Sequence, residues 1–109
     1  MKAKTDPTYN EMASFFKALA HPTRVYLLDL LALRDYCVCE LTELVGADIS
    51  TVSKHLSLLK QAKILIDFKE GNKVYYRLHY PCVQEIIGCV ANRNTALVNA
   101  QNKAPSICQ

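Results

Sequence analysis

Apolar residues recur at spacings of three and four along most of the chain, the repeat of an amphipathic α-helix. The clearest example runs from Ala47 to Ile64, where one stripe is apolar: Ile49, Val52, Leu56 and Leu59. Asp48 stands just before this stripe, where a carboxylate can accept the free N–H groups of a first helical turn. The opposite face is small, polar and basic: Ser50, Thr51, Ser53, Lys54, Ser57 and Lys60. Such a face suits the DNA major groove, with hydroxyls near base edges and lysines near phosphates.

On its own this stretch is equally consistent with an ordinary surface helix, but the residues before it favour the DNA-binding interpretation. A short helix is predicted from about Val38 to Val45, with Leu41, Leu44 and Val45 turned inward. Gly46 ends it, as a left-handed cap does. Two helices joined by a tight turn that contains Gly, the second with a polar and basic face, match the helix-turn-helix pattern.

Two helices are predicted ahead of this pair. The first, from Thr8 to Leu19, carries a bulky stripe of Met12, Phe15, Phe16 and Leu19. This stripe is either a core face or, on the terminal helix of so small a domain, a face that buries against a second subunit. Pro22 fits the first position of the second helix, where its missing N–H costs nothing. That helix extends to about Leu33 and is expected to be buried through Leu27, Leu28, Leu30 and Leu31.

A β-hairpin is predicted after the 47–64 stretch. Residues 64–69 and 73–78 alternate, and the intervening Glu70-Gly71-Asn72 tolerates positive φ. Lys69 and Lys73 flank the tip, so the hairpin is a basic wing placed for an adjacent groove or backbone. The predicted DNA contacts are Ser50, Thr51, Ser53, Lys54, His55, Ser57, Lys60, Lys69, Asn72 and Lys73.

Pro81 opens a last helix, whose apolar side carries Val83, Ile86, Ile87, Val90, Leu97 and Val98. The predicted fold is mainly α with a β-hairpin, in the order α-α-α-α-β-β-α, a winged helix-turn-helix. The domain is expected over residues 8–99, between a flexible N-terminal arm at 1–7 and a flexible C-terminal tail at 100–109.

Composition is consistent with a single domain of a size at which dimerisation commonly adds buried surface. The net charge of the 109 residues is only +3, but residues 48–80 hold six basic against three acidic residues. We find no secretory signal and no membrane-spanning run, so a cytoplasmic protein is expected. An enzyme is not indicated, because the sequence shows no nucleophile–base pairing and no phosphate-binding glycine loop.

Five cysteines, an odd number in a reducing compartment, argue against a disulfide framework and towards ligation or thiol chemistry. The segments Cys37-Val-Cys39-Glu-Leu41, Ser50-Thr-Val-Ser-Lys-His-Leu56 and Ala18-Leu-Ala-His-Pro-Thr-Arg24, with the hairpin around Gly71, closely resemble the ArsR/SmtB metalloregulators, and within them the arsenical-resistance repressors. The similarity covers roughly residues 9–95.

The resemblance implies a homodimer joined through the first and last helices, by residues Met12, Phe15, Phe16, Leu19, Val83, Ile86, Ile87 and Val90. It also implies a repressor that leaves its operator when a thiophilic ligand occupies Cys37 and Cys39. A dimer places two reading helices about one DNA turn apart, so the double-stranded operator is expected to be an imperfect palindrome.

The resemblance implies a thiophilic ligand, and the number of thiols ranks arsenic above zinc. Trivalent arsenic and antimony are soft and bind thiolates, whereas zinc prefers four ligands. Thr42 stands where many arsenical repressors carry a third cysteine. Two thiols fill both exchangeable positions of a monosubstituted organoarsenical, while arsenite would want a third sulfur, from Cys82, Cys89, Cys108 or a small cellular thiol. The predicted inducer is therefore As(III), as arsenite or an organoarsenical.

The spacing of the two cysteines sets a geometric condition. Residues two apart in a regular helix point about 200° apart. Cys37 and Cys39 can reach one ion only if the helix start is extended or unwound, and ligand capture is expected to distort this first turn.

Three alternatives remain at this point. One is a repressor of the same fold that responds to thiol oxidation or persulfidation. Another is a sensor of a different soft metal, such as antimony, cadmium, lead or zinc. The third is a winged-helix protein-interaction module that never contacts DNA.

Overall fold

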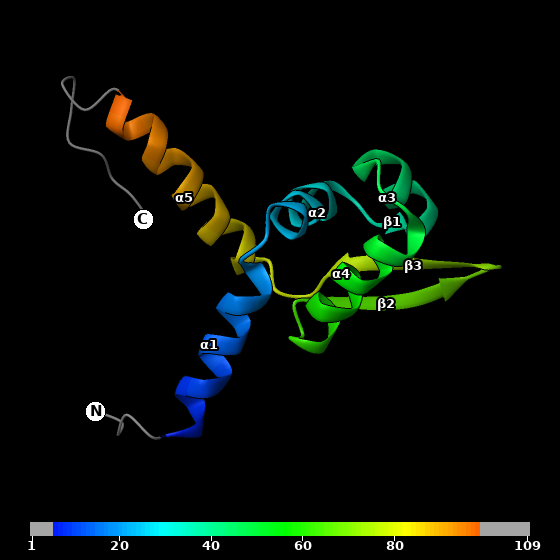
Figure 1. Ribbon diagram of the computed structural model, residues 1–109, viewed down its shortest axis with the longest axis horizontal. Coiled ribbons are helices and arrows are strands. Elements are labelled where there is room, and N and C mark those ends of the chain that lie inside the picture. The colour runs from blue at the N-terminus through cyan, green and yellow to red at the C-terminus, as the bar shows by residue number, and fades with distance from the viewer. Residues whose placement is uncertain (1–5, 99–109) are drawn as a thin grey trace. The chain divides into compact units, whose positions relative to one another are not determined.

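The computed structural model describes residues 6–98, with side chains described as far as residue 92. Eight elements follow one another: α1 (Pro7–Leu19), α2 (Pro22–Leu33), β1 (Tyr36–Cys37), α3 (Val38–Val45), α4 (Ile49–Gln61), β2 (Leu65–Glu70), β3 (Lys73–Leu78) and α5 (Cys82–Val98). This is a mainly helical winged helix-turn-helix (Figure 1). Among the described residues, 6–79 form one compact unit and 80–98 form a second, which contains α5.

The predicted N-terminal arm and C-terminal tail lie mostly outside the residues that the structure describes. Pro7 already belongs to α1, because Asp6 caps that helix by accepting the Thr8 N–H at 2.8 Å. The helix therefore begins one residue earlier than expected. Residues 1–5 of the predicted arm and the whole predicted tail, 100–109, lie outside the described residues.

The core of the first unit joins α2, α3 and α4 to the sheet. α3 packs on α4, and α4 packs along β2. The fully buried apolar side chains are Leu27, Leu28, Leu41, Val52, Leu56, Leu59, Ile64 and Leu65. The helical pattern of the sequence identified six of these as inward-facing positions, and the other two, Ile64 and Leu65, belong to the first strand of the predicted hairpin.

Two residues assigned to this core are instead exposed. Ile49 is 58% exposed because it is the first residue of α4, next to the exposed Asp48 and Ser50, so the helix start extends beyond the core. Leu44 is 47% exposed, since the eight-residue α3 fully buries only Leu41.

The sheet has a strand that the sequence did not predict. β1 pairs with β3, so the order is β1-β3-β2 with antiparallel neighbours, and Cys37 lies opposite Tyr75. A strand of two residues shows no alternation and leaves no periodic signal. In the hairpin, Glu70 pairs with Lys73, and Gly71 takes a φ of 64°, as the primed hairpin turns require of their first central residue.

No helix within residues 6–98 is long and apolar enough to cross a membrane.

Candidate DNA-binding surface and thiol site

The start of α4 is fixed by Asp48. Its carboxylate accepts the Thr51 N–H at 3.2 Å and the Ser50 hydroxyl at 3.0 Å. Hydrogen bonds from Thr51 and then from Ser50 lower the pKa of Asp48. Ser50 and Thr51 are both exposed. The Ser50 hydroxyl donates its hydrogen to Asp48, so it could contact a base edge only as a hydrogen-bond acceptor, or as a donor after breaking its bond to Asp48.

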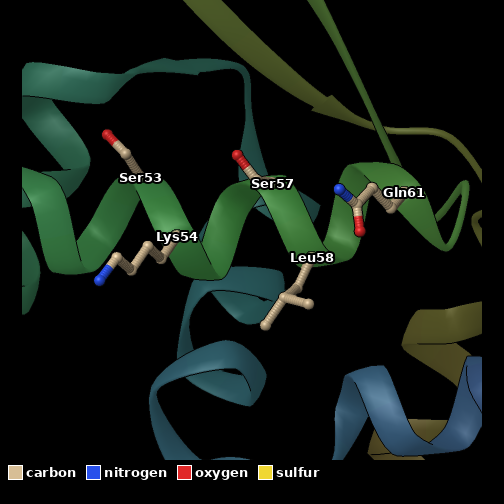
Figure 2. Close-up of a pocket in the computed structure, with 5 residues that line it drawn as sticks. All are labelled: Ser53, Lys54, Ser57, Leu58 and Gln61. Carbon is tan, nitrogen blue, oxygen red and sulfur yellow. The ribbon is translucent and has the colours of Figure 1, made fainter.

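The middle of α4 presents a shallow groove of about 410 Å³ (Figure 2). Ser53 and Ser57 point to one side of the helix, and Lys54 and Leu58 to the other. Leu58 was not among the predicted contacts, yet it is 45% exposed. The groove on α4 is therefore polar and basic, with Leu58 as its one apolar lining residue.

The lysines of this surface differ in whether an acidic side chain neutralises them. Lys60 donates to Asp67 at 2.9 Å, and this hydrogen bond raises the pKa of Lys60. Within residues 6–92, the ion pairs use Arg34, Lys60 and Arg77, so Lys54, Lys69 and Lys73 form no ion pair with another residue of this range. Asn72, at the tip of the hairpin, is also exposed.

His55 was predicted to contact DNA but is half-buried against the start of α2. Its ring lies 4.5 Å from that of His21, and its Nδ1 lies 3.2 Å from a guanidinium nitrogen of Arg24. Burial, then the charges of His21 and Arg24, lower the pKa of His55. The reason is positional: His55 is three residues after Val52 and four before Leu59, so it falls beside the buried stripe.

Cys37 and Cys39, together called the dithiol site below, come together at the junction of β1 and α3. Cys37 is the N-cap of α3, with extended backbone (φ −82°, ψ 161°), and Cys39 lies in the first turn. Their sulfur atoms are 2.6 Å apart. Cys37 is buried, 2% exposed, whereas Cys39 is exposed. The extended start that the spacing required is thus present, and no unwinding of α3 is needed to bring the sulfurs together.

The sulfur separation can be compared with known chemistry. A disulfide is about 2.05 Å long, and two thiolates on a tetrahedral zinc, with bonds of about 2.3 Å, lie about 3.8 Å apart. The 2.6 Å of the dithiol site falls between these values. The two sulfurs thus lie within the separation that a single bridging atom spans.

The surroundings of Cys37 hold it by its backbone. The Cys37 N–H donates to Glu40 Oε1 at 3.0 Å, and Arg34 pairs with Glu40 Oε2 at 3.1 Å. Burial is the main cause that raises the pKa of Cys37, followed by the neighbouring Cys39 sulfur. The pKa of Glu40 is lowered, first by the Cys37 N–H and then by Arg34.

A third ligand is not evident next to the two sulfurs. The Thr42 hydroxyl donates to the Val38 carbonyl at 2.8 Å, back along its own helix. Among the described residues, no group of three His, Cys, Asp or Glu side chains could hold a metal ion. The site therefore offers two sulfur ligands.

The dithiol site is also tied to the wing. Cys37 pairs with Tyr75 on β3, and beside this pair Asp35 forms a two-oxygen ion pair with Arg77, with distances of 2.7 and 3.0 Å. Arg77 in turn covers the ring of Phe68, 4.7 Å from its centroid. Sequence reasoning missed these partners, because Asp35 and Arg77 are 42 residues apart.

The residues predicted to join two subunits lie on α1 and α5. On α1, Met12 and Phe16 are 43% and 55% exposed, and Phe15 and Leu19 are half-buried. On α5, Val90 and Ile86 are 53% and 37% exposed, Ile87 is half-buried, and Val83 is already buried in the single chain. Each helix thus carries exposed apolar side chains of the kind that a subunit interface covers.

Comparison with known proteins decides the family. A model of the bacterial regulatory proteins of the arsR family matches residues 21–66. The arsenical resistance operon repressor of Escherichia coli is 34% identical over 108 residues, covering 85% of this chain and 92% of the repressor. The chain belongs to the ArsR family of bacterial transcriptional regulators.

Solved structures agree with this assignment to the ArsR family. The crystal structure of Mycobacterium tuberculosis Rv0081 superposes with a TM-score of 0.74 at 36% identity, covering 89% of this chain and 97% of that one. A homodimeric winged helix-turn-helix DNA-binding domain from Mycobacterium bovis, a possible ArsR-family regulator, superposes with a TM-score of 0.80 at 25% identity, covering 96% and 100%. This ArsR-family chain is therefore a DNA-binding transcriptional regulator and not an enzyme.

Proposed function

We propose that this ArsR-family regulator is a repressor that leaves its operator when a trivalent arsenical bridges Cys37 and Cys39. The observation that carries the proposal is the approach of the two sulfurs to 2.6 Å, with Cys39 accessible at the surface. A soft ion that binds thiolates can be captured there without prior rearrangement of α3. A relative of known role, the repressor from Escherichia coli, is named for arsenical resistance.

The number of sulfurs favours an organic arsenical. An alkyl- or aryl-As(OH)₂ exchanges two hydroxyls for the Cys37 and Cys39 thiols and releases two waters, with arsenic staying trivalent. Its organic substituent keeps the third position. Arsenite has three exchangeable positions, and the Thr42 hydroxyl, engaged with Val38, supplies no third sulfur.

The route from ligand to DNA runs through Cys37. This residue belongs at once to β1, which pairs with the wing strand β3, and to the start of α3, which packs on α4. A ligand bonded to both sulfurs ties Cys37 to Cys39, and so links the end of β1 to the first turn of α3. A displacement of Cys37 acts on the wing and on the reading helix together.

The DNA-binding form is proposed to be a homodimer joined through α1 and α5, on a double-stranded operator that is an imperfect palindrome. The homodimeric winged helix-turn-helix DNA-binding domain from Mycobacterium bovis supports the homodimer. Two copies of α4 about one DNA turn apart would each read one half-site. The coupling between ligand and DNA is expected to be about 1–3 kcal/mol and reciprocal.

The test is an operator-release titration. Operator is first selected from a random duplex library, and the labelled complex is then titrated with arsenite, methyl-As(III) and phenyl-As(III), with antimonite and Cd²⁺ alongside. We expect release by at least the organic arsenicals at lower concentration than by Cd²⁺. Release by none of the three arsenicals would contradict the proposal.

A second candidate rests on the same short separation. Peroxide would oxidise the Cys37 and Cys39 thiols to a disulfide, with the two thiol hydrogens leaving as water and the peroxide reduced to a second water. Operator release by peroxide in the absence of arsenic, a mass loss of two hydrogens and reversal by a thiol reductant would favour this oxidative switch over the arsenical.

A further inference from the structure

Cys37 occupies an unusual position for a cysteine. N-cap residues are normally Ser, Thr, Asp or Asn, whose side-chain oxygens accept N–H groups of the first turn. A thiol sulfur is a weak acceptor. Cys37 is nevertheless the N-cap of α3. A residue that breaks a local rule in this way is expected at a functional site, and another group has to hold the turn in place.

Glu40 is the group that holds it. One carboxylate oxygen accepts the Cys37 N–H at 3.0 Å, and the other pairs with Arg34 at 3.1 Å. The Arg34 guanidinium is itself fixed, because it lies 3.8 Å from the centroid of the Tyr36 ring and donates to the Asp35 carbonyl at 2.9 Å. Asp35 and Tyr36 therefore fix the position of Arg34, and Arg34 in turn fixes the position of Glu40.

This arrangement contributes little to stability. The Arg34 and Glu40 side chains are 55% and 38% exposed, and exposed ion pairs are weak. Its consequence is geometric. The hydrogen bond to Glu40 keeps the Cys37 backbone extended, and that conformation directs the Cys37 sulfur to Cys39.

We propose that Glu40, fastened by Arg34, is a positioning residue that preorganises the dithiol site for a single bridging ligand. The inference rests on the proposed function for the choice of ligand, a trivalent arsenical. It adds that affinity depends on a carboxylate that never touches arsenic. Loss of this carboxylate should weaken phenyl-As(III) binding while the fold remains.

The experiment measures phenyl-As(III) binding to the full chain without DNA, from the ultraviolet absorbance of the As–S bonds. Glu40→Ala should weaken binding by about tenfold or more, the usual effect of removing a group that orients a ligand residue. Glu40→Gln keeps an oxygen for the Cys37 N–H but loses the ion pair, so its affinity should lie between those of Glu40→Ala and the wild type. Arg34→Ala should resemble Glu40→Gln.

The matched control is Glu43→Ala, which removes an exposed carboxylate from the same helix. This variant should bind phenyl-As(III) within about twofold of wild type. Circular dichroism and thermal melting verify that each variant is folded.

Glu40→Ala binding as tightly as wild type would overturn the inference, and so would equal weakening by Glu40→Ala and Glu43→Ala. Operator release is measured separately. If wild type binds phenyl-As(III) but keeps its operator, the proposed function fails while the inference is still decided by the binding data. If wild type does not bind phenyl-As(III), both are overturned.

Discussion

Lys54 should contribute more to DNA affinity than Lys60, although both lie on the basic face of α4. Lys54 is exposed and its charge is unpaired among the described residues, whereas Lys60 is bound to Asp67 at 2.9 Å. Each phosphate contact makes the logarithm of the association constant fall with the logarithm of salt concentration by a slope of about 0.9. In a dimer, Lys54→Ala removes two contacts and flattens the slope by about 1.8.

The size of this effect is measurable. When salt rises from about 50 to 200 mM, the affinity of both proteins falls. With a slope change of about 1.8, the factor by which the affinity falls is roughly 12 times smaller for the variant than for wild type. Fluorescence anisotropy of labelled operator over this range gives both slopes. Lys60→Ala should change the slope less, and Asp67→Asn, which frees Lys60, should steepen it. A Lys54→Ala slope equal to that of wild type, or a larger change in Lys60→Ala, would refute the reasoning.

Three further outcomes are expected. Leu41→Ala, at a fully buried position, should lower the free energy of unfolding in urea by about 2–5 kcal/mol, and Leu44→Ala, at a 47% exposed position, by less than about 1 kcal/mol; equal losses would mean that α3 packs by another face. Asp35→Asn breaks the ion pair with Arg77 and should cost at most about 1 kcal/mol of stability, with phenyl-As(III) affinity kept and operator release weakened; unaltered release would remove the wing from the proposed route. Arg77 lowers the pKa of Asp35. The stability that this ion pair contributes to the wild type is therefore fully present above the ordinary pKa of aspartate and is lost as the pH falls through the lowered pKa. Asp35→Asn should not show this loss of stability. Burial raises the pKa of Cys37. The rate of Cys37 alkylation by iodoacetamide in the folded protein should therefore keep rising with pH above the pH at which the rate in urea reaches its plateau. Identical pH profiles of the rate in the folded protein and in urea would contradict this.

The elements that the sequence predicted well are the long periodic ones. The reading helix, its Asp48 cap, the Gly46 terminator and the hairpin each have a local signal that tertiary packing did not override. The strand β1 has none, because two residues cannot alternate. Its partner on β3 and the Asp35–Arg77 pair depend on contacts between distant segments.

The composition of the dithiol site was predictable, and so was one condition on its geometry. The spacing of the two cysteines required an extended or unwound helix start, and Cys37, as the N-cap, has an extended backbone. A signal for this was present in Cys37-Val-Cys39-Glu40, which has the spacing of a capping box with cysteine in place of Ser or Thr. The exposure of Ile49 and the partial burial of His55 depend on how far the core extends along α4, which periodicity alone does not determine.

The most direct test of the account is operator binding by wild type, Cys37→Ser and Cys39→Ser, each with and without phenyl-As(III). The account predicts that all three bind operator with similar affinity in the absence of ligand, and that only wild type is released by the arsenical. Release of either serine variant at the wild-type concentration of phenyl-As(III) would contradict it.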